Sequence, residues 1–157
     1  MQMHQLDARI RRIKSDLWGM RIRRREPIEK IMTAPRGEEN FVPFANGAFW
    51  AETPGEHWQN FRFTVTVPGD FRGQAVLCMH SGREMTWEAT GPQVLVWVNG
   101  REEQAFYTRH TEAVLAERAE PGQTFEILLE AYYHTAQNAE GDRPVPTMTL
   151  TLADVCD

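Results

Sequence analysis

The sequence has only two cysteines, Cys78 and Cys156, and no long apolar run. Two cysteines cannot form a disulfide framework or a cysteine-rich metal cluster, so we expect a reducing, cytoplasmic location. Apolar runs such as Val94–Val98 are far too short to cross a bilayer. The first residues also lack the apolar stretch of a secretion signal. We therefore expect neither a membrane partner nor export.

Motifs of common catalytic and cofactor sites are missing from the sequence as well. It contains no glycine-rich dinucleotide loop, no phosphate-binding loop and no His-Glu-x-x-His zinc motif. Cys78 and His80 share one face of an expected strand, where a packed cysteine is favoured over a metal ligand. Glu126 and Glu130 also share a strand face, which is typical of a solvated surface. We expect no catalytic residue, metal or cofactor in this chain.

The 157 residues are 41% hydrophobic and 25% charged, which is typical of one globular domain. The formal net charge of −5 is unevenly distributed, because residues 1–30 hold nine Lys and Arg against four Asp and Glu. A basic arm is one feature of nucleic-acid binders. Here the basic residues alternate with apolar ones, and no basic groove continues them. We therefore expect no nucleic-acid partner.

The N-terminal segment carries apolar residues at alternating spacings of three and four. They are Met3, Leu6, Ile10, Ile13, Leu17 and Met20. This spacing predicts an amphipathic helix with one apolar stripe. We assign residues 1–35 to this basic helix and a linker, and residues 36–157 to a second unit. The stripe needs a covering surface, and three remain open: the chain's own body, another domain of a longer chain, or a second copy in a homo-oligomer.

From about residue 40 the hydrophobic pattern changes to a period of two. The clearest segments are residues 61–67, 75–79, 94–98, 125–129 and 148–152. Alternation of this kind predicts half-buried strands, and Asn99-Gly100 is a strong signal for a type I′ hairpin turn. Without intervening helical patterns, these segments indicate a mainly β protein. We predict an antiparallel β-sandwich of jelly-roll type, preceded by the N-terminal helix.

Aromatic residues are numerous for a β domain of this size. They are Trp50, Trp58, Trp87, Trp97, Tyr107, Tyr132 and Tyr133. Most are simply expected to fill the core, but exposed rings can stack on sugars. Trp97 alternates with three valines, so its ring is expected on the opposite strand face. One hypothesis is therefore a stand-alone carbohydrate-binding module that uses Trp87, Trp97 and Tyr107 as a stacking platform.

Four segments resemble the N-terminal domain of glycoside hydrolase family 38 α-mannosidases, and they occur in the order found in that family. They are Trp58–Pro68, Val96–Gly100, His110–Leu115 and Pro121–Tyr132. The resemblance implies a β-sandwich that precedes the catalytic barrel of a large cytosolic enzyme. It also implies that zinc and an aspartate nucleophile belong to that later domain, since no residue of this chain matches them.

The resemblance implies that this chain is a non-catalytic accessory domain, either excised from the enzyme or a short homologue. Its partners would be the remainder of the mannosidase chain and, as a ligand, a mannoside. The sequence departs from the family at Tyr107 and Arg109, where the family has aspartate and asparagine. Candidate contacts to carbohydrate or to a neighbouring domain are Trp87, Trp97, Tyr107, Arg109 and His110.

Overall fold

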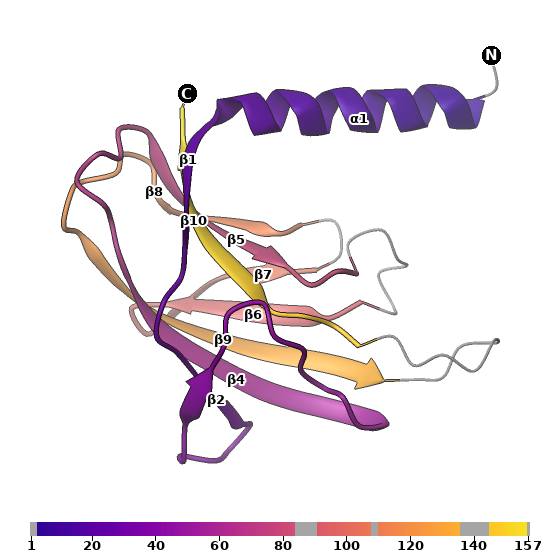
Figure 1. The fold of residues 1–157 in the computed structure, drawn as a ribbon, viewed down its shortest axis with the longest axis vertical. Helices are drawn as coiled ribbons and strands as arrows, with labels where there is room; N and C mark the ends of the chain where they lie inside the picture. The colour runs from indigo at the N-terminus through magenta and orange to yellow at the C-terminus, as the bar shows by residue number, and fades with distance from the viewer. Residues whose placement is uncertain (1–2, 84–90, 108–109, 136–144, 157) are drawn as a thin grey trace.

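The protein consists of one long helix and two antiparallel sheets (Figure 1). The computed structural model describes residues 3–83, 91–107, 110–135 and 145–156. The elements are α1 (Met3–Arg21), β1 (Ile22–Pro27), β2 (Ile31–Pro35), β3 (Val42–Phe44), β4 (Gly55–Thr66), β5 (Gln74–His80), β6 (Gln93–Val98), β7 (Arg101–Phe106), β8 (Glu112–Ala116), β9 (Thr124–Thr135) and β10 (Thr149–Val155).

The strand order is that of a jelly roll. One sheet has the order β1-β10-β5-β8, and the other has the order β3-β2-β4-β9-β6-β7. If the β2–β3 hairpin is set aside, two four-stranded sheets remain, and most loops carry the chain from one sheet to the other. The predicted fold class, an antiparallel sandwich after an N-terminal helix, is confirmed.

The predicted strands form because their alternating apolar residues meet between the two sheets. On β4, Phe61, Phe63 and Val65 are buried, while the residues between them are exposed. The partner strand β9 alternates in the same way and pairs with β4 along its whole length, from Gly55↔Thr135 to Thr66↔Thr124. This ladder forms the centre of the larger sheet and one wall of the core.

The turn between β6 and β7 has the predicted geometry. Asn99 has φ 51° and Gly100 has φ 79°, so both residues are left-handed, as a type I′ turn requires. The turn reverses the chain so that β6 pairs with β7 on one side and with β9 on the other. Val94 and Val96 then face the core, and Trp97 lies on the opposite face, as predicted.

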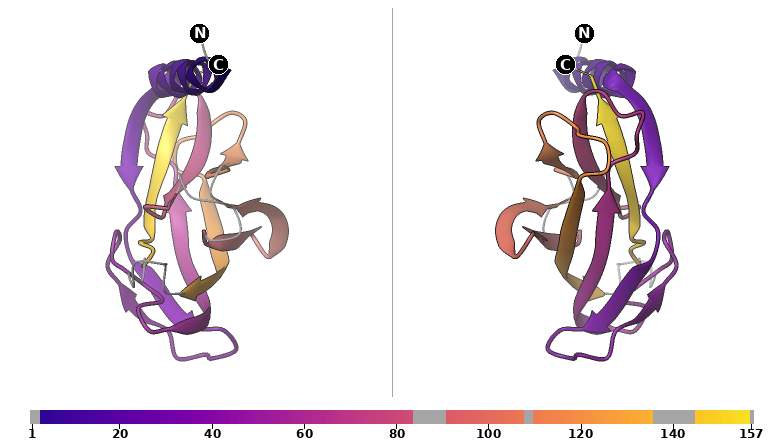
Figure 2. Two further views of the ribbon diagram at one scale, coloured as in Figure 1. Left: turned by 90° about the vertical axis from the view of Figure 1, so that its right-hand side faces the viewer. Right: turned by 90° about the vertical axis from the view of Figure 1, so that its left-hand side faces the viewer.

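Helix α1 lies across one end of the sandwich, next to the last residues of β10 (Figures 1 and 2). Its attachment is local. Trp18 and Ile22 pack on a small cluster on the outer face of the smaller sheet, which contains Val76, Cys78 and Val155. Around this junction, the Arg21 side chain donates to the Cys156 carbonyl oxygen at 3.0 Å, and the Cys156 amide donates to the Arg21 carbonyl at 2.8 Å.

The apolar stripe of α1 is not covered by the body of the protein. The exposed fractions of its side chains are 46% for Leu6, 42% for Ile10, 55% for Ile13, 56% for Leu17 and 79% for Met20. Trp18 packs on the sandwich because it projects from a different side of the helix. Of the three coverings considered from the sequence, the chain's own body is therefore excluded in this structure.

The sandwich begins earlier than the predicted boundary. Ile22–Pro27 and Ile31–Pro35 lie within the range 1–35 that we assigned to the helix and a linker, yet they form β1 and β2. Pro27 is compatible with a strand because β1 is at the edge of its sheet and pairs only with β10. Because the segment is rich in arginine, its sequence did not indicate a strand, although burial along it alternates with a period of two.

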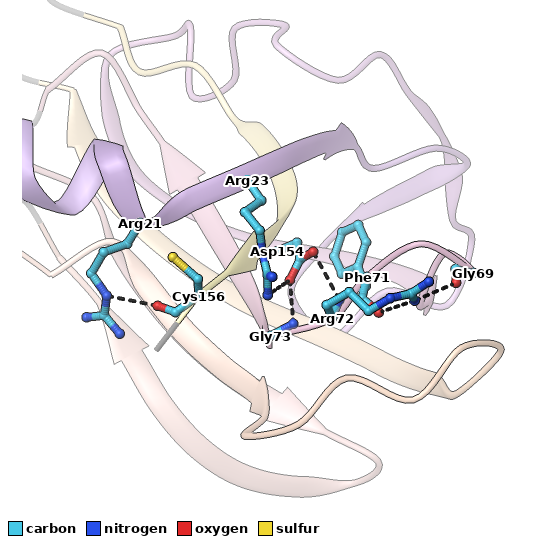
Figure 3. Close-up of polar contacts among 8 residues, drawn as sticks. All are labelled: Arg21, Arg23, Gly69, Phe71, Arg72, Gly73, Asp154 and Cys156. Atoms are coloured by element: carbon cyan, nitrogen blue, oxygen red, sulfur yellow. Dashed lines mark hydrogen bonds and ion pairs between the residues drawn. The ribbon is translucent and has the colours of Figure 1, made fainter.

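A buried carboxylate fixes the loop before β5 to β10 (Figure 3). Asp154 is 3% exposed, and its two oxygens accept the backbone amides of Arg72 at 3.1 Å and Gly73 at 2.8 Å. The Arg23 guanidinium lies 3.5 Å from the same carboxylate. Charge-assisted hydrogen bonds of this kind compensate for burying the charge. Asp154 thus joins three segments that are far apart in the sequence.

Gly73 is expected to tolerate no side chain. A Cβ atom at this position would overlap the carbonyl oxygen of Val155 and lie 2.7 Å from the Arg23 guanidinium. We expect Gly73→Ala to lower the free energy of unfolding by about 1–3 kcal/mol, since the β10 backbone must move. Gly69→Ala is the matched control, because nothing lies within 4 Å of its Cβ position. Urea titration of both variants measures the difference, and equal midpoints would contradict this packing.

Candidate functional site

The outer surface of the larger sheet carries an unusual set of side chains. Since β4, β9 and β6 are neighbours, their outward residues form rows across the sheet. One row contains Arg62, Leu128 and Trp97, and the next contains Asn60, Glu130 and Leu95. An arginine and an amide on β4 and a tryptophan on β6 are therefore placed on one face of the sheet, with β9 between them, by the same register that forms the core.

A cavity of about 540 Å³ lies on this surface beside Trp97, and we call it the Trp97 groove. Its lining comes from the β2–β3 loop, from strands β4 and β9, and from the β6–β7 hairpin. The residues are Gly37, Glu38, Glu39, Phe41, Asn60, Arg62, Glu126, Ile127, Leu128, Trp97 and Gly100. The volume is within the range of about 300–1,000 Å³ that is usual for small-molecule sites.

Two cation–π contacts hold the β2–β3 loop close to the outer face of the sheet. The Arg62 guanidinium lies 3.9 Å from the centre of the Phe41 ring. At the other end of the loop, the Arg36 guanidinium lies 4.5 Å from the centre of the Trp58 ring. Contacts of this type are attractive because the face of an aromatic ring is electronegative. The loop therefore forms a wall of the groove.

Two polar atoms of the groove residues are buried without a hydrogen bond. Within the part of the chain that the structure describes, neither Trp97 Nε1 nor Asn60 Oδ1 has a partner. One is a donor and the other is an acceptor. An unsatisfied buried polar group costs about 1–3 kcal/mol. A ligand or a solvent molecule that supplied the missing partners would therefore be favoured at this place.

The charge of the groove is mainly negative. Glu38, Glu39 and Glu126 contribute three carboxylates to its lining, against the single cation of Arg62. Glu126 is also held by the Thr64 hydroxyl, which donates to its carboxylate at 3.0 Å. Carboxylates accept hydrogen bonds from hydroxyl groups but repel anions. The groove is therefore suited to a neutral, hydroxyl-rich molecule and not to a phosphate or an organic acid.

An exposed aromatic pair lies on the same face of the sheet, two residues along β4 and β9 from the pair Asn60 and Glu130. The rings of Trp58 and Tyr132 are 4.6 Å apart with an interplanar angle of 47°. Trp58 is 46% exposed, so the pair is not part of the core. The Tyr132 hydroxyl donates to Glu56 at 3.0 Å, and this hydrogen bond to a carboxylate raises the pKa of the phenol.

The structure separates the residues that the sequence suggested as one platform. Trp97 is at the turn end of the β6–β7 hairpin, whereas Tyr107 follows the opposite end of β7. Tyr107 stacks on His110 with ring centres 5.6 Å apart, and Gln104 contacts His110 and donates to the Glu112 carbonyl at 2.7 Å. Tyr107 and His110 thus form a local loop cluster distant from Trp97.

The remaining two predicted contacts, Trp87 and Arg109, lie outside the described residues. Sequence reasoning also missed that Asn60, Arg62 and Phe41 line the same cavity as Trp97. The period-two pattern places Asn60 and Arg62 on the outer face of β4. Their presence in one cavity with Trp97 depends on strand order, which that pattern does not contain.

A second cavity, of about 650 Å³, is lined mainly by β1, by the turn that follows it and by the C-terminal end of β4. Its lining mixes charges of both signs, including Arg24, Glu26, Glu29 and Lys30. Arg24 already contacts Glu26 and Asp70 within the protein. This cavity has neither an exposed tryptophan nor a buried polar atom without a partner in the described lining, so the Trp97 groove is the better candidate site.

The described residues contain no group of three or more His, Cys, Asp and Glu side chains that could hold a metal ion. Cys78, considered above as a ligand, is buried beside Val76 and Val155. Burial raises the pKa of its thiol to about 11, despite the opposing effect of the nearby Arg25 charge.

No described helix is both long and apolar enough to span a membrane.

Two solved β-glucuronidases are similar to this chain in structure. The enzyme from Ruminococcus gnavus matches 85% of this chain and 29% of its own, with 10% identity and a TM-score of 0.44. The enzyme from Dictyoglomus thermophilum matches 83% of this chain and 28% of its own, with 11% identity and a TM-score of 0.42. The chain thus spans less than a third of either enzyme, and values this low assign neither family nor activity.

Comparison with family models and with curated proteins gives no match.

The environments of the two cysteines predict a clear difference in reactivity. Cys78 is buried with a raised pKa, whereas Cys156 is partly exposed. Since the thiolate is the reactive form, we expect Ellman's reagent at pH 8 to modify Cys156 rapidly and Cys78 only after unfolding. Cys156→Ser should abolish the fast phase, and Cys78→Ser should retain it. Rapid modification of Cys78 in the native protein would contradict its burial.

Proposed function

We propose that this chain is a non-catalytic accessory domain of a glycoside hydrolase of the α-mannosidase type, docked on a larger body through helix α1. The observation that carries the docking is the uncovered stripe from Leu6 to Met20. Contiguous exposed apolar surface on a soluble protein marks an interaction site. In the part of the chain that the structure describes, Trp18 and Arg21 attach the helix to the sandwich at its C-terminal end, and the stripe remains exposed.

The charge of the helix suits a docking role. Alongside its stripe, α1 carries Arg9, Arg11, Arg12, Lys14 and Arg21 against Asp7 and Asp16. Burial of the stripe supplies the main free energy of association, and the basic flanks favour an acidic neighbouring surface. An amphipathic helix held in this way fits a hydrophobic groove of a larger partner.

The α-mannosidase part of the proposal is supported by where the resembling segments lie. Trp58–Pro68, Val96–Gly100 and Pro121–Tyr132 fall on β4, the β6–β7 turn and β9, which are neighbours in the larger sheet. His110–Leu115 falls mainly on β8 in the other sheet. Three of the resembling segments are therefore neighbours in one sheet of this chain. Zinc and the nucleophile would be supplied by the catalytic domain.

We also propose a cytoplasmic location, which the two free cysteines support.

Hydrolysis of p-nitrophenyl α-D-mannopyranoside tests the enzymatic part of the proposal. We expect no turnover by this chain, with or without added zinc. The complete product of the gene that encodes the chain should hydrolyse the same substrate in a zinc-dependent manner. Turnover by this chain alone, or a complete product without α-mannosidase activity, would overturn the assignment to this class of enzyme.

Amide hydrogen exchange tests the docking of α1 independently of activity. We expect the α1 amides to be protected in the complete gene product relative to the isolated chain. Ile13→Asp combined with Leu17→Asp should remove that protection, because each buried side chain contributes about 1.5–3 kcal/mol. Ala8→Asp combined with Ser15→Asp is the matched control, since it adds the same charge on the other side of the helix.

The control pair should retain the protection of α1, and circular dichroism should show a folded helix in both double variants. Equal exchange of α1 in the isolated chain and in the complete product would show that the helix does not dock there.

A further inference from the structure

We propose that the Trp97 groove binds a neutral saccharide. This inference does not depend on the docking function, because none of the groove residues is part of α1. The groove combines a partly exposed indole, carboxylates and an amide around a cavity of about 540 Å³. A pyranose ring requires the same combination: an aromatic face for its C–H groups and acceptors and donors for its hydroxyl groups.

The aromatic component is Trp97, which faces outward between the core valines of β6. Trp97 belongs to the row formed with Leu128 and Arg62, and it lines the groove. Phe41 also lines the groove, but the Arg62 guanidinium already lies over its ring at 3.9 Å. We therefore assign stacking to Trp97, while Arg62 and Phe41 form another part of the lining.

The polar component is incomplete without a ligand. Asn60 Oδ1 accepts no hydrogen bond and Trp97 Nε1 donates none within the described part of the chain. A sugar hydroxyl is both donor and acceptor, so vicinal hydroxyls can satisfy both atoms. Both atoms are covered by protein atoms here, and a ligand reaches them through a local side-chain movement. Such movements are common on binding, while backbones usually change little.

The charge of the groove selects among sugars. Glu38, Glu39 and Glu126 can accept hydrogen bonds from hydroxyl groups, but they would repel a uronate or a sugar phosphate. The ligand is therefore an uncharged hexose or a short neutral oligosaccharide. The exposed Trp58–Tyr132 pair, two residues from Asn60 on the same face, is outside this lining, and the Arg36 guanidinium already lies over the Trp58 ring.

Calorimetric titration of the isolated chain with methyl α-D-mannopyranoside, maltose and cellobiose tests this proposal, with D-glucuronate as the anionic comparison. We expect saturable binding of at least one neutral saccharide and at least tenfold weaker binding of glucuronate. In NMR spectra, the Trp97 indole N–H resonance, assigned by its absence in Trp97→Phe, should shift on binding.

Trp97→Ala should weaken binding at least tenfold, and Asn60→Ala and Glu38→Gln should weaken it severalfold. Glu38 is exposed on a loop, so its substitution leaves the fold intact. Phe49→Ala is the control, because Phe49 is an aromatic residue that is 59% exposed and does not line the groove. Absence of saturable binding for all three neutral saccharides, equal binding of glucuronate, or unchanged affinity in Trp97→Ala would each overturn the proposal.

Discussion

The pairing of β4 with β9 is the interaction on which the rest of the structure depends. It runs for twelve residues on each strand, and it fixes which side chains face the core and which face outward. Phe61 and Leu129 point inward and are fully buried, so Arg62 and Leu128 must point outward, where Leu128 is paired with Trp97 of β6. A shift of one residue would exchange the two faces, exposing the core and burying the charges. The same register therefore determines the buried core on one face of the sheet and the groove on the other.

The orientation of the side chains of helix α1 does not depend on this strand register. Its stripe arises from a local spacing of three and four residues, and no described part of the sandwich buries it. The sandwich instead takes Trp18 and Ile22 onto the small cluster around Val76, Cys78 and Val155. One side of the helix is thus attached to the sandwich, and the side that carries the stripe is exposed. The surface that stabilises the domain is therefore separate from the surface available to a partner.

The sequence predicted what depends on local periodicity and missed what depends on strand order. The outward direction of Trp97 and the turn at Asn99-Gly100 follow from alternation and from backbone preference, and both are present in the structure. The strand Ile22–Pro27 was missed because arginines replace the usual apolar and β-branched residues of a strand. The sequence alone could not predict that Trp97, Asn60 and Phe41 line one cavity. That arrangement depends on the order of β4, β9 and β6 and on the course of the β2–β3 loop.

The contact between Arg21 and Cys156 brings the two ends of the sandwich to one place. Ile22 pairs with Val155 in the same sheet, so the strand that enters the fold and the strand that leaves it are neighbours. Since Cys156 contacts Arg21, a polypeptide joined to the end of β10 would emerge beside the C-terminal end of α1. A tether at that point would raise the effective concentration of the helix near whatever follows it. Even a weak contact through the stripe would then hold two covalently linked modules in a defined orientation.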